Sequence, residues 1–335
     1  MHVTHGPYIL VLFLVLLFPS VPNAKTHALL IGVSGYPSLP QADRLIGPAN
    51  DVRLIRAALL RQGVRSSSIR ILADGVSGSI GLPTRREILA ALADLEFRAE
   101  AGDWVIVYFS GHGSQQKQLS NHPSYVEPDG LDEIFLPYDI GRWDGSQMVV
   151  ENAISDDEIG LAIDALRRKN IRVWAIFDTC HAGDMAKSLS LQPEQPLFRY
   201  IHPKVLGVPS EFSGGDAVVT PKSLDSHTSR TPRSIALSRQ PKQIPQPGLV
   251  IFYASQPEEP AAEELLPNPI LQGSRNAMAA KLYFGYFTYL IAKSMPGWRG
   301  SFRQLAEKIS QYYDRRPYPT PSFEGSLDES LTMAP

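Results

Sequence analysis

Short runs of consecutive apolar residues alternate along this chain with longer segments in which apolar residues recur every three or four positions. The apolar runs have the continuity of strands buried on both faces of a parallel sheet, and they cover residues 27–33, 68–73, 104–109, 171–177 and 249–254. The periodic segments predict helices near residues 50–62, 84–99, 155–168, 286–295 and 302–315. This alternation predicts an α/β fold with a mostly parallel central sheet and helices on both of its faces.

Three of the predicted helices begin with a Ser or Thr that stands three residues before a Glu or Gln. The pairs are Thr84 with Glu87, Ser155 with Glu158, and Ser301 with Gln304. Such a pair can form a capping box, in which each side chain accepts a hydrogen bond from the other residue's backbone N–H. The three pairs therefore mark predicted helix starts.

The alternation stops between residues 188 and 247, where the chain is rich in Pro, Ser and basic residues and keeps no apolar period. A connection of this length without elements of its own is uncommon inside a compact domain and is typical of a functional or disordered insertion. We therefore expect residues 25–187 and 248–335 to build one fold that is interrupted by a flexible insertion at 188–247.

Residues 1–24 contain an uninterrupted apolar run at 8–18, which is followed by Pro19 and Pro22. A membrane-spanning helix needs roughly 20 apolar residues, whereas the apolar part of a secretory signal needs about 7 to 15. The run therefore predicts a signal peptide that ends near Ala24 and a mature protein that is secreted or periplasmic. An uncleaved N-terminal anchor and a buried core segment are the alternatives.

Composition and charge exclude several classes of protein. Hydrophobic residues make up 43% of the 335 residues and charged residues 20%, which excludes wholesale disorder and a multi-span membrane protein. A formal net charge of −2 provides no long-range field for nucleic acid, so we expect no such partner. The single cysteine, Cys180, excludes an intrachain disulfide, a Cys-rich zinc site and an iron–sulfur cluster.

Reactive residues follow two of the predicted strands. His112 and Gly113 come shortly after the run at 104–109, and Cys180 comes shortly after the run at 171–177. Ligands bind at the carboxyl ends of parallel strands. A thiolate and its base could meet there. The N–H groups of Gly113 and Cys180 could bind an oxyanion at the same place. The alternatives are a buried structural cysteine and a turn histidine. His181 is a poorer base because neighbouring side chains diverge.

Residues 108–115, together with residues 177–183, resemble the caspase-like cysteine peptidases, and most of all the metacaspases. The resemblance covers about two-thirds of the chain in the family's order. It implies a caspase-like three-layer sandwich and a cysteine endopeptidase in which His112 and Cys180 form the dyad and Gly113 completes the oxyanion hole. It also implies that residues 25–187 correspond to the large subunit of that fold and residues 248–335 to the small one, in a monomer that acts on proteins or peptides.

The resemblance further implies cleavage after Arg or Lys, with Asp51 and Asp178 as acidic pocket residues and Ser110 lining the same pocket. Buried carboxylates at the base of a pocket favour a cationic side chain and reject an acidic one. Two structural alternatives stay open: Asp51 can cap the helix that follows it, and Asp178 can simply support its turn.

Many metacaspases bind calcium through Asp residues outside the active site, and the matching residues here are Asp132, Asp156 and Asp157. Carboxylates suit this hard cation, so calcium is an expected cofactor that the peptidase chemistry itself does not require. Asp156 and Asp157 also lie where a helix dipole alone favours acids, and Lys187 occupies the position of the family's fourth ligand.

The segment 221–247 is a predicted self-cleavage linker because it offers basic residues in Pro-rich chain, and the bonds after Arg230 and Arg239 are the better candidates. The alternative is a solvent-exposed insertion that is never cut. Two rival functions use the same residues: a catalytically dead caspase-like interaction module, and an acyl-transferring ligase.

Overall fold

The computed structural model describes residues 24–118, 130–180, 197–212, 248–256, 259, 261–269, 281–314 and 319–331. Its centre is a six-stranded sheet in the order β14-β11-β9-β3-β1-β2. The strands are β1 (Thr26–Gly32), β2 (Ile69–Ala73), β3 (Trp104–Ser110), β9 (Arg172–Asp178), β11 (Leu249–Tyr253) and β14 (Ser322–Gly325). All neighbours in it are parallel except β14, which runs antiparallel to β11. The prediction of a mostly parallel sheet is therefore confirmed, with each predicted strand within one or two residues of its observed bounds.

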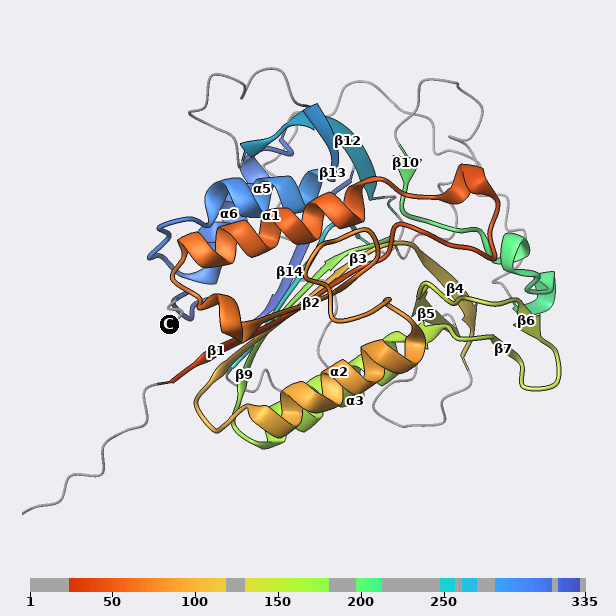
Figure 1. Cartoon of the computed structure of the whole chain (residues 1–335), viewed down its shortest axis with the longest axis horizontal. Coiled ribbons are helices and arrows are strands. Elements are labelled where there is room, and N and C mark those ends of the chain that lie inside the picture. Colours follow the sequence, from red (N-terminus) through yellow and green to blue (C-terminus); the bar gives the residue numbers. More distant parts are fainter. Residues whose placement is uncertain are drawn as a thin grey trace, which may run out of the picture.

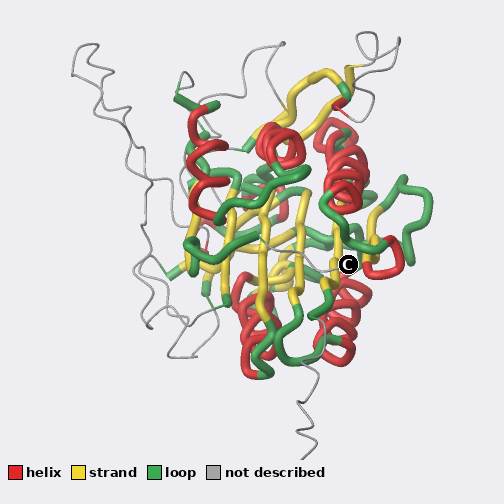
Figure 2. Tube along the Cα trace, turned by 90° about the vertical axis from the view of Figure 1, so that its left-hand side faces the viewer, coloured by secondary structure: helices red, strands yellow, loops and turns green. Residues whose placement is uncertain are grey.

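Helices cover both faces of this sheet, as the alternation predicts (Figures 1 and 2). One face carries α1 (Gly47–Arg61), α5 (Tyr286–Ser294) and α6 (Phe302–Gln311), and the other carries α2 (Arg85–Arg98) and α3 (Asp156–Arg168). Successive strand residues point to opposite faces. Tyr108 of β3 therefore packs in the core beneath the first group of helices, and Phe109 packs beneath the second. The result is the predicted three-layer sandwich.

All three helices begin where the capping pairs predict, but only two of the three capping boxes are complete. Ser155 with Glu158 and Ser301 with Gln304 form complete capping boxes at the starts of α3 and α6. At the start of α2, the Thr84 side chain accepts from the Glu87 N–H, but the Glu87 carboxylate pairs with Arg86 instead of the Thr84 N–H. Only half of that predicted box is formed.

Small sheets stand around the carboxyl ends of the central strands. One contains β4 (Gly113–Lys117), β5 (Leu131–Phe135) and β8 (Ile154–Ser155), and another contains β10 (Leu197–Phe198), β12 (Ala262–Pro267) and β13 (Lys281–Gly285). A two-stranded ribbon joins β6 (Trp143–Asp144) to β7 (Val149–Val150). Short 3-10 turns cover Gln41–Asp43, Ser66–Ser68, Pro203–Leu206 and Ser210–Phe212. The apolar pattern predicts none of these pieces.

Part of the predicted insertion at 188–247 departs from the expectation of chain without structure. Residues 197–212 contain β10 and two 3-10 turns. Strand β10 pairs with β12, which lies more than sixty residues further along the chain, so local periodicity does not reveal it. The basic residues of 221–247, including Arg230 and Arg239, lie outside the described residues.

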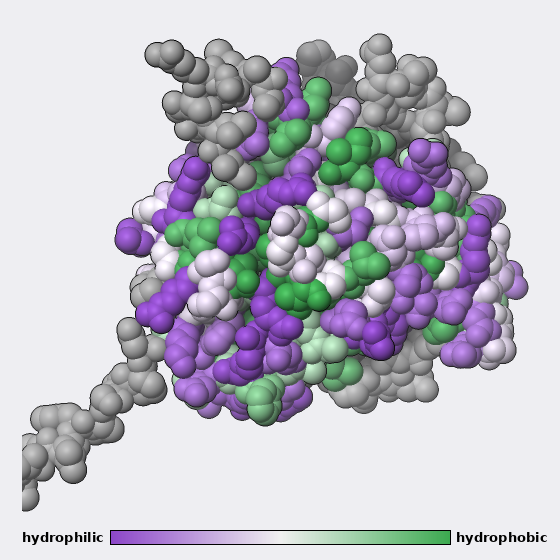
Figure 3. Space-filling view, viewed as in Figure 1, coloured by the Kyte–Doolittle hydropathy of each residue, from purple (hydrophilic) through white to green (hydrophobic). Residues whose placement is uncertain are grey.

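The N-terminal apolar run at 8–18 also lies outside the described residues, so the signal peptide stays a prediction. Among the helices of the described ranges, none has both the length and the apolar character to cross a membrane. On the face seen in Figure 3, hydrophobic residues lie in small groups among hydrophilic ones.

Candidate active site

Neighbouring strands bring the two predicted dyad residues to one end of the sheet. β3 and β9 are adjacent and parallel, and their register pairs Ser110 with Asp178. His112 and Cys180 each follow two residues beyond that pair, and both are buried. The pairing therefore places the imidazole and the thiol at the same sheet edge, where the sequence predicts them.

Hydrogen bonds set the tautomer and orientation of His112. Its Nε2 lies 2.6 Å from the backbone carbonyl of Asp43, and because a carbonyl only accepts, the proton belongs to Nε2. Nδ1 then carries the lone pair, and this buried atom has no hydrogen-bond partner within the described part of the chain. Burial lowers the pKa of His112 to about 4, an effect that the Asp43 carbonyl partly offsets. His112 is thus a neutral imidazole with a free basic nitrogen.

Cys180 is held by the backbone of Ala261. Its Sγ accepts the Ala261 N–H at 2.6 Å and lies 3.2 Å from the Ala261 carbonyl oxygen. Burial raises the pKa of the thiol to about 12, although the Ala261 N–H lowers it in part. Among the described residues no hydrogen bond joins Cys180 to His112, so the pair rests as thiol and neutral imidazole.

Two backbone N–H groups converge beside the thiol. Those of Gly113 and Cys180 both donate to the carbonyl oxygen of Arg199, at 2.9 and 3.4 Å. Two such donors on one carbonyl oxygen form the arrangement that stabilises an oxyanion. A Cβ at position 113 would lie 1.9 Å from the Cys180 carbonyl oxygen, so only glycine allows this approach.

The Arg199 side chain fills a closed acidic pocket and is fully buried. Its Nη1 lies 2.9 Å from Ser110 Oγ and 3.1 Å from Asp178 Oδ1. Its Nη2 lies 2.5 Å from Asp51 Oδ2 and 3.5 Å from Glu263 Oε1. The structure thus brings all three predicted pocket residues, Asp51, Asp178 and Ser110, around one guanidinium group, and adds Glu263.

Other elements hold the three carboxylates in place. Asp51 Oδ1 accepts the Gly285 N–H at 3.0 Å, and Asp178 Oδ2 accepts the Thr288 N–H at 3.1 Å. Glu263 accepts the N–H groups of Ile46 and Gly47 at the start of α1, at 3.0 and 2.9 Å. The pocket therefore depends on α1, β9, β12 and the start of α5 together.

These contacts decide the two structural alternatives. Asp51 is not a helix cap, because α1 already begins at Gly47 with Ile46 at the N-cap. Asp178 supports the start of α5 through one oxygen while its other oxygen contacts Arg199. Neither carboxylate has a role confined to its own turn.

The charge of the pocket favours a cation. Burial raises the pKa of Asp51 to about 7; Arg199 lowers this pKa, whereas Asp178 raises it further. Burial likewise raises the pKa of Glu263. Burial alone would lower the pKa of Arg199, but Asp178, Asp51 and Glu263 together raise it well above its ordinary value. Three carboxylates against one guanidinium make a site in which a cationic group is strongly retained.

Sequence reasoning missed Arg199, Glu263 and Thr288 as site residues. Glu263 lies in a short segment, 259–263, that carries part of the family resemblance, and this is the only signal that could have pointed to it. Thr288 likewise ends a segment, 285–288, that carries part of the resemblance. Arg199 has no distinguishing pattern around it, because its role depends on contacts with residues far away in the chain.

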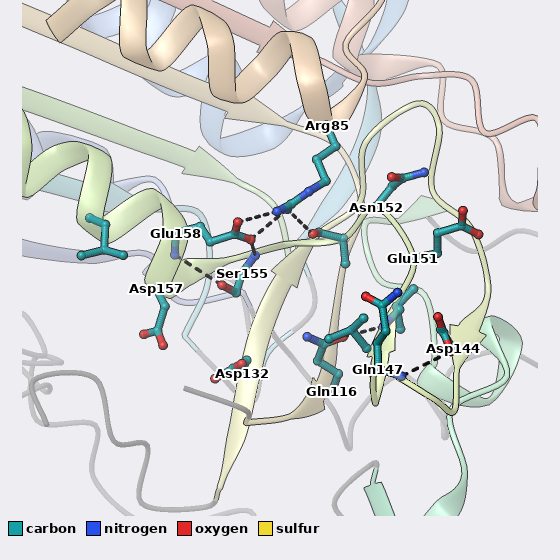
Figure 4. A pocket seen from close by; sticks show the side chains of 14 residues that line it. Arg85, Gln116, Asp132, Asp144, Gln147, Glu151, Asn152, Ser155, Asp157 and Glu158 are labelled. Atoms are coloured by element: carbon teal, nitrogen blue, oxygen red, sulfur yellow. Dashed lines mark hydrogen bonds and ion pairs between the residues drawn. The ribbon is translucent and has the colours of Figure 1, made fainter. Parts of the chain in front are cut away.

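The predicted calcium ligands are only partly brought together. Asp132 and Asp157 line one pocket with Arg85, Gln116 and Asp144, whereas Asp156 is not among the lining residues. In Figure 4 Asp144 lies across this pocket from Asp157. Within the described ranges no group of three or more His, Cys, Asp or Glu side chains is placed to hold a metal ion. Lys187 lies outside those ranges, and calcium binding stays a prediction.

Comparison with known proteins gives matches of two kinds. Residues 26–188 match the metacaspase, peptidase C14 domain. Metacaspase-1 of Lodderomyces elongisporus is 32% identical over 167 residues, which cover 50% of this chain and 35% of that protein. Metacaspase-1B of Neurospora crassa is 31% identical over 201 residues, which cover 58% and 44%. The crystal structure of protein GSU0716 from Geobacter sulfurreducens has a TM-score of 0.57 at 17% identity, covering 92% of this chain and 99% of that one.

The matched domain contains both His112 and Cys180. The likeness to the Geobacter protein concerns the fold alone. The chain spans less than half the length of the two curated relatives named above.

Proposed function

Because residues 26–188 match the metacaspase, peptidase C14 domain, we propose that this protein is a cysteine endopeptidase that cleaves after Arg or Lys through Cys180 and His112. The placement of Arg199 is the observation that carries the proposal. Its side chain lies among Asp51, Asp178 and Glu263 while its carbonyl oxygen accepts two N–H groups beside the thiol. A substrate residue before a scissile bond needs this combination of side-chain pocket and polarised carbonyl.

In the proposed reaction, His112 Nδ1 takes the thiol proton of Cys180, and Sγ attacks the carbonyl carbon of the residue in the pocket. The N–H groups of Gly113 and Cys180 stabilise the negative charge that develops on the carbonyl oxygen. The peptide C–N bond then breaks, and His112 gives its proton to the departing amine. Water hydrolyses the resulting thioester with His112 moving the protons, which restores the thiol.

The pocket contacts favour Arg over Lys as the residue before the scissile bond. The two terminal nitrogens of a guanidinium contact different carboxylates, those of Asp178 and Asp51. A lysine ammonium is a single charged centre and cannot span both in the same way. An acidic side chain would add negative charge to three buried carboxylates, so it is rejected.

The specificity is tested with fluorogenic peptides that carry Arg, Lys or Asp before the reporter group. We expect kcat/KM for Arg to exceed that for Lys by about tenfold and Asp to be inert. Asp51→Asn should lower kcat/KM for the Arg peptide by about tenfold or more, because the guanidinium loses a buried ionic partner. The matched control is Asp328→Asn, which removes an exposed carboxylate paired with Arg303. Faster hydrolysis of the Asp peptide would contradict the proposal.

The two rival functions are separated from a peptidase by their products. A dead interaction module would leave an active-site thiol probe unreacted at Cys180, and a ligase would join the acyl group to an added amine in preference to water. The unprotonated Nδ1 of His112 and the two converging N–H groups favour a working enzyme, since a binding module needs neither.

We also propose that the protein is exported and acts as a monomer without a nucleic-acid partner. The apolar run at 8–18 supports export. N-terminal sequencing of the protein from its native host should give a first residue near Lys25, and sedimentation should give the mass of one chain. A native protein that keeps residues 1–24 would contradict removal of a signal peptide.

Calcium dependence is a separate part of the proposal, and no reaction step depends on it. Asp132 and Asp157 would supply carboxylate oxygens from their shared pocket, and Asp156 is the third predicted ligand. Calorimetric titration of the purified protein with calcium should show binding that Asp132→Asn weakens. No heat of binding, together with unchanged activity in excess chelator, would remove calcium from the proposal.

A further inference from the structure

Asp103 lies immediately before β3, at the amino end of the central sheet. The first residue of β3, Trp104, pairs with Thr26 at the start of β1 and with Arg172 at the start of β9. The Asp103 carbonyl accepts the Arg172 N–H at 2.9 Å. The Lys25 carbonyl accepts the Trp104 N–H at 2.8 Å. Asp103 is therefore placed where three parallel strands begin, at the edge of the sheet opposite to the candidate active site.

The carboxylate of Asp103 is buried and accepts hydrogen bonds from two backbone groups. Asp103 is only 4% exposed. Its Oδ1 accepts the Lys25 N–H at 2.7 Å, and its Oδ2 accepts the Glu100 N–H at 3.0 Å. Oδ2 also lies 3.3 Å from His27 Nε2. One carboxylate oxygen thus faces the backbone nitrogen of Lys25 directly.

Asp103 has no permanently charged partner among the described side chains. Within the described ranges its one ion pair is with His27, which carries a charge only when it is protonated. The guanidinium group of Arg172 instead donates to the Gly102 carbonyl at 2.8 Å and lies over the Trp104 ring. A buried carboxylate normally lies beside a cation, because the cation offsets its loss of hydration. The fold therefore has a place for one positive charge beside Oδ1 of Asp103.

We propose that Asp103 binds the α-ammonium group that forms on Lys25 when a signal peptidase removes residues 1–24. This inference rests on the proposed export and does not depend on the peptidase reaction of this chain. Hydrolysis of the Ala24–Lys25 bond uses one water and leaves a carboxylate on Ala24 and an amine on Lys25, and an α-amine is mostly protonated at pH 7. The Lys25 nitrogen already lies 2.7 Å from Asp103 Oδ1, so the new charge forms in contact with the carboxylate.

This contact selects the bond before Lys25 among the bonds near the end of the predicted signal peptide. A cut one residue earlier would place the ammonium group on Ala24, one residue away from the contact with Asp103. A cut one residue later would remove the Lys25 carbonyl, which accepts the Trp104 N–H. Only a chain that begins at Lys25 keeps its hydrogen bond to β3 and also places its terminal charge against the buried carboxylate.

Removal of the signal peptide then stabilises the fold. Before the cut, Asp103 accepts a hydrogen bond from the neutral N–H group of a peptide bond. After the cut, the same oxygen faces a charged donor, and opposite charges that are shielded from water attract each other more strongly than exposed ones. The cut therefore shifts the equilibrium toward the folded state, and the precursor lacks this contribution.

The test compares a chain that begins at Lys25 with a matched chain that begins at Ala24, both with Cys180→Ala so that neither cuts itself. Every described element lies within both chains. We expect the equilibrium constant for unfolding in urea to be about tenfold smaller for the chain that begins at Lys25. Asp103→Asn should remove this difference, because the terminal charge then has no anionic partner.

Two further measurements make the result specific. His27→Gln should leave the tenfold difference in place, because His27 contacts the other oxygen of the carboxylate. An acylating reagent at pH 7 should label the terminal amine of the Lys25 chain about tenfold more slowly than that of the Ala24 chain, because only the unprotonated amine reacts. Mass spectrometry of the N-terminal peptide measures this labelling. It needs no change at Asp103, so it tests the inference if Asp103→Asn fails to fold.

The possible failures are distinguishable. Equal stability of the two chains, or equal labelling of their terminal amines, overturns the inference even when the native protein begins at Lys25, and leaves the proposed export standing. A difference in stability that survives Asp103→Asn shows that the charge is bound elsewhere and also overturns it. A native protein that keeps residues 1–24 overturns the removal of a signal peptide and this inference together, and leaves the peptidase proposal standing.

Discussion

His112 and Cys180 are both buried, and burial shifts the pKa of each in the direction that removes its charge. His112 stays neutral at pH values at which an ordinary histidine is protonated. Cys180 stays a thiol at pH values at which an ordinary cysteine is ionised. The resting pair is therefore not a thiolate–imidazolium pair. In the proposed mechanism, its reactivity comes from proton transfer when the thiol reaches His112 Nδ1, which is unpartnered among the described residues.

Replacement of either residue should remove this step. We expect Cys180→Ala and His112→Ala each to lower hydrolysis of an Arg peptide by at least about a thousandfold, because the nucleophile or its base is missing. Circular dichroism should show the same secondary structure as the wild type. More than a trace of activity in Cys180→Ala would rule out a thiol mechanism, since the chain has no other cysteine.

The pKa of His112 also predicts how stability depends on pH. Burial lowers it from 6.5 to about 4, so between these values the unfolded chain binds a proton that the folded chain does not. The free energy of unfolding therefore decreases as pH falls through this window, by up to about 3 kcal/mol.

This contribution is isolated by comparing Cys180→Ala with Cys180→Ala/His112→Gln, since neither chain can cut itself. Asp51 acts in the opposite direction because its pKa is raised, but both chains carry it and its effect cancels. The stability advantage of the chain that keeps His112 should shrink between pH 7 and about 4.5 in urea unfolding. A difference independent of pH would show that His112 is not held neutral by burial.

At the scale of elements, the three predicted capping pairs differ in how completely the capping box is formed, so their contributions to the free energy of unfolding should differ. Ser301 and Gln304 satisfy each other's backbone at the start of α6, whereas at α2 only the Thr84 side chain takes part. We expect Ser301→Ala to lower the free energy of unfolding by about 1 kcal/mol and Thr84→Ala to lower it by less. Urea unfolding of both variants in the Cys180→Ala chain measures this. A larger loss for Thr84→Ala would contradict the assignment of the complete box to α6.

At the scale of the whole molecule, the central sheet should hold the two pieces of the chain together after a self-cleavage cut between β9 and β11, such as one after Arg230 or Arg239. β9 lies before the cut and β11 after it, and the two strands pair in parallel from Val173 with Leu249 to Phe177 with Tyr253. Both strands are also buried between the helix layers.

We therefore expect the two pieces to elute from a size-exclusion column at the volume of uncut Cys180→Ala and to separate only in denaturant. The shared apolar core is the physical reason, because separation would expose it to water. Elution of two separate smaller species under native conditions would show that the sheet does not hold them.

The sequence by itself determined the layers of this protein and the placement of His112 and Cys180 at one edge of the sheet. Buried strands must be continuously apolar and helices must keep an apolar stripe, so β1, β2, β3, β9 and β11 and the five described helices are visible as local patterns. Parallel strands all present their carboxyl ends at one edge, so the sequence alone places residues that follow β3 and β9, such as His112 and Cys180, close together.

Only the tertiary structure decided what surrounds His112 and Cys180. Glu263 and Thr288 reach the pocket from β12 and α5, and Arg199 enters it from the short strand β10. Short strands with distant partners carry no periodic signal, and an ion pair between residues 148 positions apart, such as Arg199 with Asp51, leaves no local trace. Local patterns record which surface of an element is buried, whereas the identity of the groups that meet there depends on how distant elements pack.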